Sequence, residues 1–215
     1  MKPPAAVARI FDGLDRHYPD ADTELAHRNA FELLAATMLS AQSTDARVNL
    51  VTPALFARFP DAKAMAGADA AELETLIHAT GFFRQKAKSL IGMATILVTE
   101  HEGQVPPSMD ALVALPGVGR KTANVVLNIA FGEPTIAVDT HLFRIGNRTG
   151  IAPGKDVAAV EAKLMKLVPA EFRQHAHHWL ILHGRYVCKA RAPDCPACLI
   201  SDLCEYKHKT VSGER

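Results

Sequence analysis

Apolar residues recur along this chain with the spacing of an α-helix, and this periodicity constrains the fold more than any other feature. Val7, Ile10, Phe11 and Leu14 fall at i, i+3, i+4 and i+7, so they would form one stripe on a helix surface. Similar stripes follow along the chain, whereas the alternation typical of a β-strand is almost absent. The sequence therefore predicts an all-α protein with glycine turns between its helices. These turns are expected at Gly81, Gly103, Gly117, Gly132 and Gly150.

The 215 residues are 48% hydrophobic and 22% charged, an ordinary balance for a globular chain that can build its own core. This length predicts one large domain or two modest ones. No apolar run is long enough to cross a bilayer, and the N-terminal segment lacks the apolar core of a signal peptide, so no membrane partner is expected. We therefore expect a cytoplasmic location, where thiols stay reduced.

Charge is distributed unevenly along the chain. Residues 1–114 carry a net charge of −4, and residues 115–215 carry a net charge of +5. A basic C-terminal half fits a polyanionic partner, because each neutralised phosphate releases counterions. A solvated charged surface without a partner explains the same numbers, so charge only supports what the motifs indicate.

Four cysteines lie close together near the end of the chain, at Cys188, Cys195, Cys198 and Cys204. Clustered thiols in a reducing compartment predict a tetrathiolate metal site rather than disulfides. Zinc and an iron–sulfur cluster can each take four cysteines, and the C-x6-C-x2-C-x5-C spacing favours iron–sulfur because only one pair is as close as in zinc knuckles. The segment between the first two cysteines carries two basic residues expected to face outward, within reach of phosphate: Lys189 and Arg191.

A glycine-rich hairpin is predicted between two helical segments, in the string Leu115-Pro-Gly-Val-Gly-Arg-Lys-Thr-Ala123. Gly117 and Gly119 allow a tight turn whose amides can approach a partner closely, while Val118 packs inward and Arg120 is a further candidate for DNA contact. Amides at the start of a helix bind anions, here a DNA phosphate. Although G-x-G alone is typical of any helix–helix connection, the full string resembles the helix-hairpin-helix element of DNA-repair proteins.

Lys121 falls in the first turn of the helix that follows the hairpin. The helix dipole disfavours a cation there, and partial desolvation would add to this effect, so the neutral amine is favoured. A neutral amine is a nucleophile that can form a Schiff base. A simple phosphate contact is the alternative interpretation of a lysine beside such a turn.

Asp139 comes 18 positions after Lys121, just before the next predicted helix. Taken singly, it is expected to be an N-cap. A carboxylate held by N-cap amides stays ionised, and it can stabilise the oxocarbenium character that develops when a base leaves its sugar. Lys121 and Asp139 are therefore the minimal pair for excising a base and capturing the sugar carbon.

With these motifs in this order, the chain resembles the helix-hairpin-helix/Gly-Pro-Asp glycosylases, and specifically bacterial endonuclease III, from Phe31 to Cys204. The resemblance implies two all-α domains with a DNA cleft between them. One would be a six-helix barrel carrying the hairpin (residues 23–133), and the other a helical iron–sulfur domain (residues 1–22 and 134–215). It also implies a [4Fe-4S] cluster on the four cysteines.

The same resemblance implies a bifunctional DNA glycosylase and AP lyase for oxidised pyrimidines in duplex DNA, acting as a monomer in the bacterial cytoplasm and associated with the nucleoid. Lys121 would attack C1′, and Asp139 would stabilise the developing positive charge. Gln42 matches the glutamine that fills the gap left by a flipped base. Phe82 stands where the family often has a leucine wedge. His141 borders the lesion pocket in this interpretation, or is a structural histidine.

Three other functions remain open at this stage. A monofunctional adenine glycosylase would lack the lysine at position 121 and carry a further C-terminal domain. A DNA-binding module without chemistry would gain nothing from a carboxylate at Asp139 beside a phosphate. A different lesion, such as a pyrimidine dimer or mismatched uracil or thymine, would use the same machinery with another pocket shape.

Overall fold

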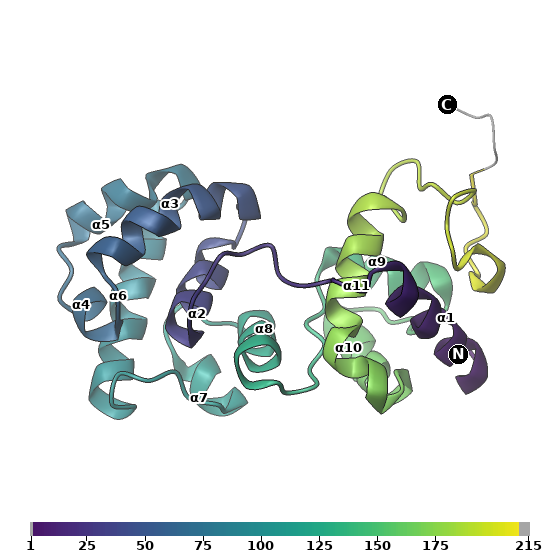
Figure 1. Cartoon of the computed structure of the whole chain (residues 1–215), viewed down its shortest axis with the longest axis horizontal. Helices are drawn as coiled ribbons and strands as arrows, with labels where there is room; N and C mark the ends of the chain where they lie inside the picture. Colours follow the sequence, from purple (N-terminus) through teal and green to yellow (C-terminus); the bar gives the residue numbers. More distant parts are fainter. Residues whose placement is uncertain (1, 211–215) are drawn as a thin grey trace. The chain divides into compact units, whose positions relative to one another are not determined.

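The computed structural model describes residues 2–210, and this part of the chain contains α-helices, short 3-10 helices and no β-strand (Figure 1). The prediction of an all-α protein is confirmed. Contacts divide the chain into two compact units, each built around its own apolar core. We call Thr23–Gly132 the hairpin unit, and Met1–Asp22 with Glu133–Arg215 the cysteine unit. No helix among the described residues combines the length and apolar character needed to cross a bilayer.

The hairpin unit contains one short helix, α4, that apolar periodicity did not predict. α4 is only five residues long, and Asp61 begins it by accepting a hydrogen bond from the Ala64 amide. The helices of this unit are α2 (Ala30–Leu39), α3 (Asp45–Arg58), α4 (Ala62–Ala66), α5 (Ala70–Ile77), η1 (His78–Thr80), α6 (Phe83–Glu100), α7 (Met109–Ala114) and α8 (Arg120–Phe131).

Helix α2 is the core helix of the hairpin unit, because every residue from Phe31 to Leu39 is buried. It packs against α3, α6 and α8. A helix that is apolar all round is stable only inside a core. Its one buried carboxylate, Glu32, accepts hydrogen bonds from the backbone amide and the guanidinium of Arg28. α2 therefore offers a rigid base for the loop that follows Leu39.

Helix capping divides the α-helices of the hairpin unit into two groups. α2, α3, α4, α5 and α7 each begin with an Asn, Thr, Asp or Ser side chain that accepts a backbone hydrogen bond. Within the described structure, α6 and α8 begin without a side-chain cap, at Phe82 and Gly119 respectively. Positions that break a local rule obeyed elsewhere in a fold are often functional. Both exceptions fall at predicted DNA contacts.

The cysteine unit is formed by both ends of the chain. Helix α1 packs on α11, and the buried Trp179 indole donates a hydrogen bond to the Tyr18 carbonyl, 3.1 Å away. Helix α9 packs against both α10 and α11. The helices of this unit are α1 (Pro4–His17), α9 (Thr140–Thr149), α10 (Val157–Leu167), η2 (Ala170–Phe172), α11 (Arg173–Tyr186) and η3 (Ser201–Leu203).

Candidate active site

The hairpin between α7 and α8 requires a glycine at position 117 for two separate reasons. Its φ angle is 78°, a region that residues with a side chain rarely adopt. In addition, a Cβ on Gly117 would lie 2.7 Å from the Ser89 Cβ and 3.1 Å from the Met38 Cε. Val118 is 6% exposed, and its amide donates to the Leu115 carbonyl. The turn is therefore anchored inward through Val118, as its sequence predicts.

Gly119 is under no such restriction. A Cβ built there meets nothing within 4 Å, and the residue begins α8 without a side-chain cap. Gly119, Arg120 and Lys121 are all exposed. The start of α8 thus presents backbone amides and two basic side chains on the surface, which is the arrangement that binds a phosphate.

Lys121 is the second residue of α8, in the first turn as predicted. Its exposure differs from the partial desolvation considered from the sequence. Its side chain is therefore open to a partner at the start of α8.

Asp139 is the N-cap of α9, where its Oδ1 accepts hydrogen bonds from the His141 amide at 2.8 Å and the Leu142 amide at 3.0 Å. Both bonds fall on Oδ1, so the cap does not use the Oδ2 of this half-buried residue. The preceding residues 136–138 are buried and fix the approach of the chain. Asp139 belongs to the cysteine unit, whereas Lys121 belongs to the hairpin unit.

His141 is connected to the cysteine segment through a residue that sequence reasoning did not select. The Arg144 guanidinium lies 3.0 Å from the His141 Nδ1 and donates to the carbonyls of Gly184 and Cys188. A Cβ on Gly184 would lie 2.7 Å from the His141 Cβ, so the histidine is also tightly packed against α11. These contacts fix the position of the His141 ring at the start of α9.

Gln42 and Phe82 share an uncommon backbone conformation. Their φ angles are 54° and 48°, in the left-handed region, and both residues are exposed. Phe82 is 67% exposed, which is unusual for a large apolar side chain. A left-handed bulky residue persists only where its surroundings impose it, and such strain concentrates at ligand-binding positions.

The four cysteines line one cavity in the cysteine unit. None forms a disulfide, and all are half-buried. Burial raises the pKa of the Cys198 thiol to about 11, a backbone hydrogen bond from Ile200 opposes the rise, and the three other thiols add to it. Because all four thiols line the same cavity, they form a donor set suited to a metal-containing group.

Positive and polar groups surround this cavity. The Arg148 guanidinium lies 3.7 Å from the Cys188 Sγ, and the His183 Nε2 lies 3.5 Å from the Cys198 Sγ. Burial lowers the pKa of His183 to about 4, so its ring is neutral at physiological pH. Among the described residues, no three His, Cys, Asp or Glu side chains are gathered so that they could hold a single metal ion.

The segment after the first cysteine is shaped by Arg148. Its guanidinium donates to the carbonyls of Lys189 at 2.7 Å and Ala190 at 2.9 Å. Lys189 and Arg191 are exposed, as expected from the sequence. Arg144 and Arg148 are four residues apart on α9 and so share a face. The sequence shows the spacing of the two arginines, but only the structure shows which carbonyls they contact.

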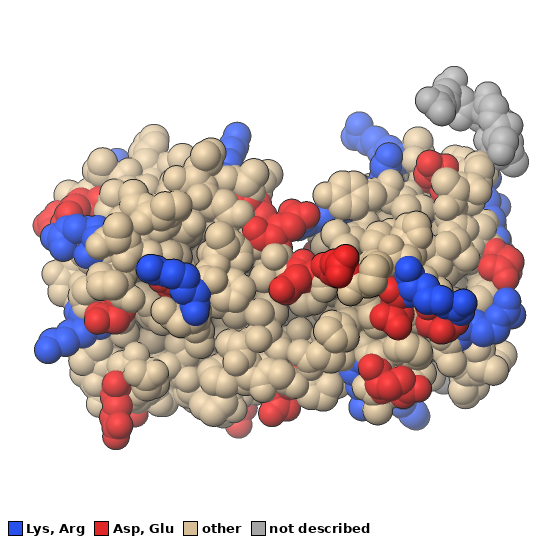
Figure 2. All heavy atoms as spheres, viewed as in Figure 1, with Lys and Arg blue, Asp and Glu red and all other residues tan. Residues whose placement is uncertain are grey.

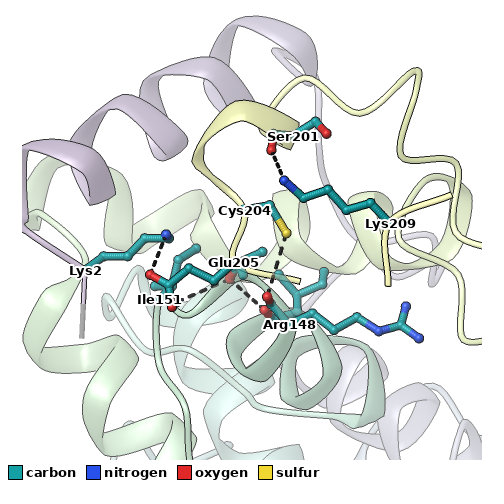
Figure 3. A network of polar contacts seen from close by, with 9 residues as sticks. Lys2, Arg148, Ile151, Ser201, Cys204, Glu205 and Lys209 are labelled. Carbon is teal, nitrogen blue, oxygen red and sulfur yellow. Dashed lines mark hydrogen bonds and ion pairs between the residues drawn. The ribbon is translucent and has the colours of Figure 1, made fainter. Parts of the chain in front are cut away.

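The segment around the last cysteine contacts both helix α9 and the N-terminal segment, as Figure 3 shows. The Cys204 Sγ lies 3.7 Å from the Arg148 carbonyl, and the next residue, Glu205, forms an ion pair of 2.9 Å with Lys2. The Glu205 amide also donates to the Thr149 carbonyl. The tail around Cys204 is therefore bonded to the end of α9 and to the N-terminal segment.

Surface charge is mixed on the face of the molecule drawn in Figure 2. Lys and Arg side chains are scattered there among Asp and Glu, and no continuous basic area is visible over the described residues on that face.

Comparisons with known proteins agree with these features. The family model of the HhH-GPD superfamily base excision DNA repair protein matches residues 35–170, which include the hairpin, Lys121 and Asp139. Endonuclease III of Escherichia coli (strain K12) is 54% identical over 200 residues, which cover 93% of this chain and 95% of that protein. Endonuclease III of Haemophilus influenzae is 54% identical over 202 residues, with the same coverage of 93% and 95%.

Solved structures of DNA glycosylases are also similar to this chain. A non-covalent endonuclease III–DNA complex superposes with a TM-score of 0.89 at 44% identity, over 95% of this chain and 96% of that chain. A thermostable thymine-DNA glycosylase, at 22% identity over 94% of this chain and 96% of that chain, shares the fold with a TM-score of 0.86. The chain therefore belongs to the HhH-GPD superfamily of base excision DNA repair proteins, and within it to the endonuclease III family of DNA glycosylases.

Proposed function

We propose that this base excision repair enzyme removes oxidised pyrimidines from duplex DNA through Lys121 and then cuts the strand as an AP lyase. One observation carries the proposal: the family match spans both Lys121, exposed at the uncapped start of α8, and Asp139, the cap of α9. Support for duplex DNA as the partner comes from the similarity to the endonuclease III–DNA complex. We extend the proposal to a monomer in the bacterial cytoplasm.

Lys121 acts as the nucleophile. Its neutral amine attacks C1′ of the damaged nucleotide, and the electron pair of the glycosidic bond leaves with the base, which takes up a proton. Loss of a proton from nitrogen and opening of the sugar ring give a protonated Schiff base on the lysine. Loss of a C2′ proton then expels the 3′ phosphate, which breaks the strand, and water finally releases the lysine.

Asp139 stabilises the positive charge that develops on the sugar as the base departs. Its two amide hydrogen bonds hold the carboxylate in one orientation. Because the cap uses only Oδ1, Oδ2 is available to face the sugar or to accept a proton. A preorganised charge of this kind acts without reorganisation at the moment of reaction.

The remaining predicted contacts hold the DNA. The α8 amides beside Gly119 bind a phosphate on one side of the lesion. Gln42 and Phe82 occupy the space that the extruded nucleotide leaves, and their exposure and strained backbone support this role. The other residues proposed to contact DNA are Gly117, Val118, Arg120, His141, Lys189 and Arg191.

Cys188, Cys195, Cys198 and Cys204 are proposed to hold a [4Fe-4S] cluster. The four thiols line one cavity, and their C-x6-C-x2-C-x5-C spacing favours an iron–sulfur cluster over zinc. When bound, such a cluster supplies four metal–thiolate bonds that tie the tail together, and it can exchange an electron. No step of base excision or strand cleavage is assigned to it.

Reductive trapping tests the role of Lys121. The wild-type enzyme is incubated with duplexes that contain thymine glycol, an abasic site or a mismatch, and borohydride is added to reduce the Schiff base. We expect a covalent protein–DNA adduct and a cut strand with thymine glycol and the abasic site. Lys121→Gln should lose both, while Lys63→Gln, which changes another exposed lysine, should retain them.

Three outcomes would contradict the proposal. An adduct that persists in Lys121→Gln places the nucleophile elsewhere, and an uncut abasic duplex removes the lyase activity. Release of only a mismatched base, with thymine glycol left intact, assigns the enzyme a different lesion.

A further inference from the structure

Lys86 is a buried lysine that the proposed chemistry does not use. It lies on α6, and the residue is only 8% exposed. Its ammonium donates hydrogen bonds to the carbonyls of Leu39 and Thr80, both at 2.8 Å. Burial lowers its pKa. A lysine is rarely placed inside a protein, because the ammonium loses its hydration there.

The two carbonyls belong to the ends of different helices. Leu39 is the last residue of α2, and Thr80 is the last residue of η1. Carbonyl groups at a helix C-terminus lack intrahelical partners and carry partial negative charge, so a cation is favourable beside them. One side chain therefore joins two chain segments that are 41 residues apart in the sequence.

Each of these helix ends leads directly into a strained residue. Gln42 comes three residues after Leu39, and Phe82 comes two residues after Thr80. The Lys86 backbone amide donates to the Phe82 carbonyl at 3.0 Å, which is the first backbone hydrogen bond of α6. The contact specific to the Lys86 side chain is the one to the Thr80 carbonyl, two residues before Phe82.

The two strained turns need flanking structure that holds them in place, and the Lys86 side chain contacts the helix end before each one. Gln42 and Phe82 stand on separate turns, and a left-handed backbone persists only if the flanking structure over-determines it. An apolar residue at position 86 could fill the same space, but it would leave two helix-end carbonyls without their donor. The ammonium sets where each carbonyl lies and therefore where each turn begins.

We propose that Lys86 is a positioning residue that sets the spacing between Gln42 and Phe82, so that the two side chains together fill the gap opposite an extruded nucleotide. The proposal rests on the DNA contacts of the proposed function. It adds a residue that does not touch DNA but affects how far the base opposite the lesion is unstacked.

The test measures the DNA distortion without requiring chemistry. A duplex carries a tetrahydrofuran abasic analogue, which cannot form a Schiff base, opposite 2-aminopurine, whose fluorescence rises when it is unstacked. The variants are Lys86→Met, the matched control Lys88→Met, which changes an exposed lysine two residues along the same helix, and the double variant Gln42→Ala/Phe82→Ala.

We expect the fluorescence increase at saturating enzyme to fall at least several-fold in Lys86→Met and to be unchanged in Lys88→Met. Introducing Lys86→Met into the double alanine background should cause no further loss, because residues that act as one unit are not additive. Lys86→Arg, which keeps the charge and the donors, should restore most of the signal. Borohydride trapping through Lys121 at saturating enzyme should change much less than the fluorescence, since an abasic nucleotide needs little help to leave the stack.

A wild-type fluorescence response in folded Lys86→Met would overturn the proposal, and so would a full further loss in the double alanine background. Lys86→Gln can still donate to one carbonyl and replaces Lys86→Met if that variant does not fold; a wild-type signal in Lys86→Gln contradicts the proposal equally. The trapping reaction separates the two ideas. If the wild-type enzyme traps DNA and Lys86→Met gives a wild-type fluorescence increase, only the role of Lys86 is refuted. If the wild-type enzyme never traps DNA, the proposed function is refuted.

Discussion

Gly117 and Gly119 flank the same valine, but they are glycines for different reasons. Gly117 has a positive φ angle and no room for a Cβ, so the folded hairpin itself requires it. Gly119 has a negative φ angle of −92° and open space around it, so the fold would accept a side chain there. Its lack of a side chain is useful only if something else approaches the α8 amides closely.

This contrast predicts opposite behaviour for two matched substitutions. Gly117→Ala should lower the free energy of unfolding by about 1–3 kcal/mol, because it combines backbone strain with a clash. Gly119→Ala should change it by less than about 1 kcal/mol, yet weaken binding to abasic-analogue DNA. Urea unfolding and fluorescence anisotropy measure the two effects. Wild-type DNA affinity in Gly119→Ala would show that no phosphate binds at the start of α8.

At the level of elements, the ends of helices carry the candidate chemistry while their middles carry the cores. The hairpin unit caps most of its α-helices with side chains but leaves α6 and α8 without one, at the two places proposed to meet DNA. In the cysteine unit, Asp139 combines both uses, since the carboxylate that begins α9 is also the proposed electrostatic group. One side chain therefore serves both as a helix cap and as the proposed electrostatic group.

These two uses of Asp139 can be separated. Asp139→Asn keeps an oxygen acceptor for the cap but removes the charge, so stability should stay close to wild type while the rate of base release falls on the order of 10²–10³-fold. Asp139→Ala should lose the cap as well, at a cost of about 0.5–2 kcal/mol. Thermal unfolding and single-turnover release of thymine glycol distinguish the variants. Full activity in Asp139→Asn would remove the carboxylate charge from the mechanism.

At the level of the whole molecule, both units have an apolar core, but the tail of the cysteine unit depends on other contacts. The hairpin unit is built on the continuous core around α2. In the cysteine unit, the tail after α11 contains little helix, and its described contacts include the ion pair between Lys2 and Glu205 and the hydrogen bonds from Arg148. The four thiols line one cavity in the same region.

Loss of one cysteine should therefore affect one unit only. In Cys204→Ser we expect lower iron content and weaker visible absorption, together with faster amide hydrogen exchange in residues 187–210 and in α1, because Glu205 connects this segment to Lys2. Exchange in α2 through α8 should remain at the wild-type rate. Unchanged iron content would remove Cys204 from the ligand set, and faster exchange in α2 would show that the cluster also stabilises the hairpin unit.

Much of this protein could be predicted from the sequence because the relevant signals are local. Helical periodicity needs only neighbours within two turns, which is why α1 and its buried stripe were predicted correctly. The N-cap role of Asp139 and the inward packing of Val118 also depend on residues a few positions away. The five-residue α4 was missed, because one turn and a half shows too little periodicity to be recognised.

Only the tertiary structure decided which distant groups meet. A lysine on α6 would be expected at the surface from its type alone, yet Lys86 is buried because the ends of α2 and η1 converge on it. Arg148 reaches the carbonyls after the first cysteine for the same reason, across about 40 residues of chain. Periodicity and capping record the conformation of a segment, whereas these contacts depend on how segments pack, and packing is determined by all of them together.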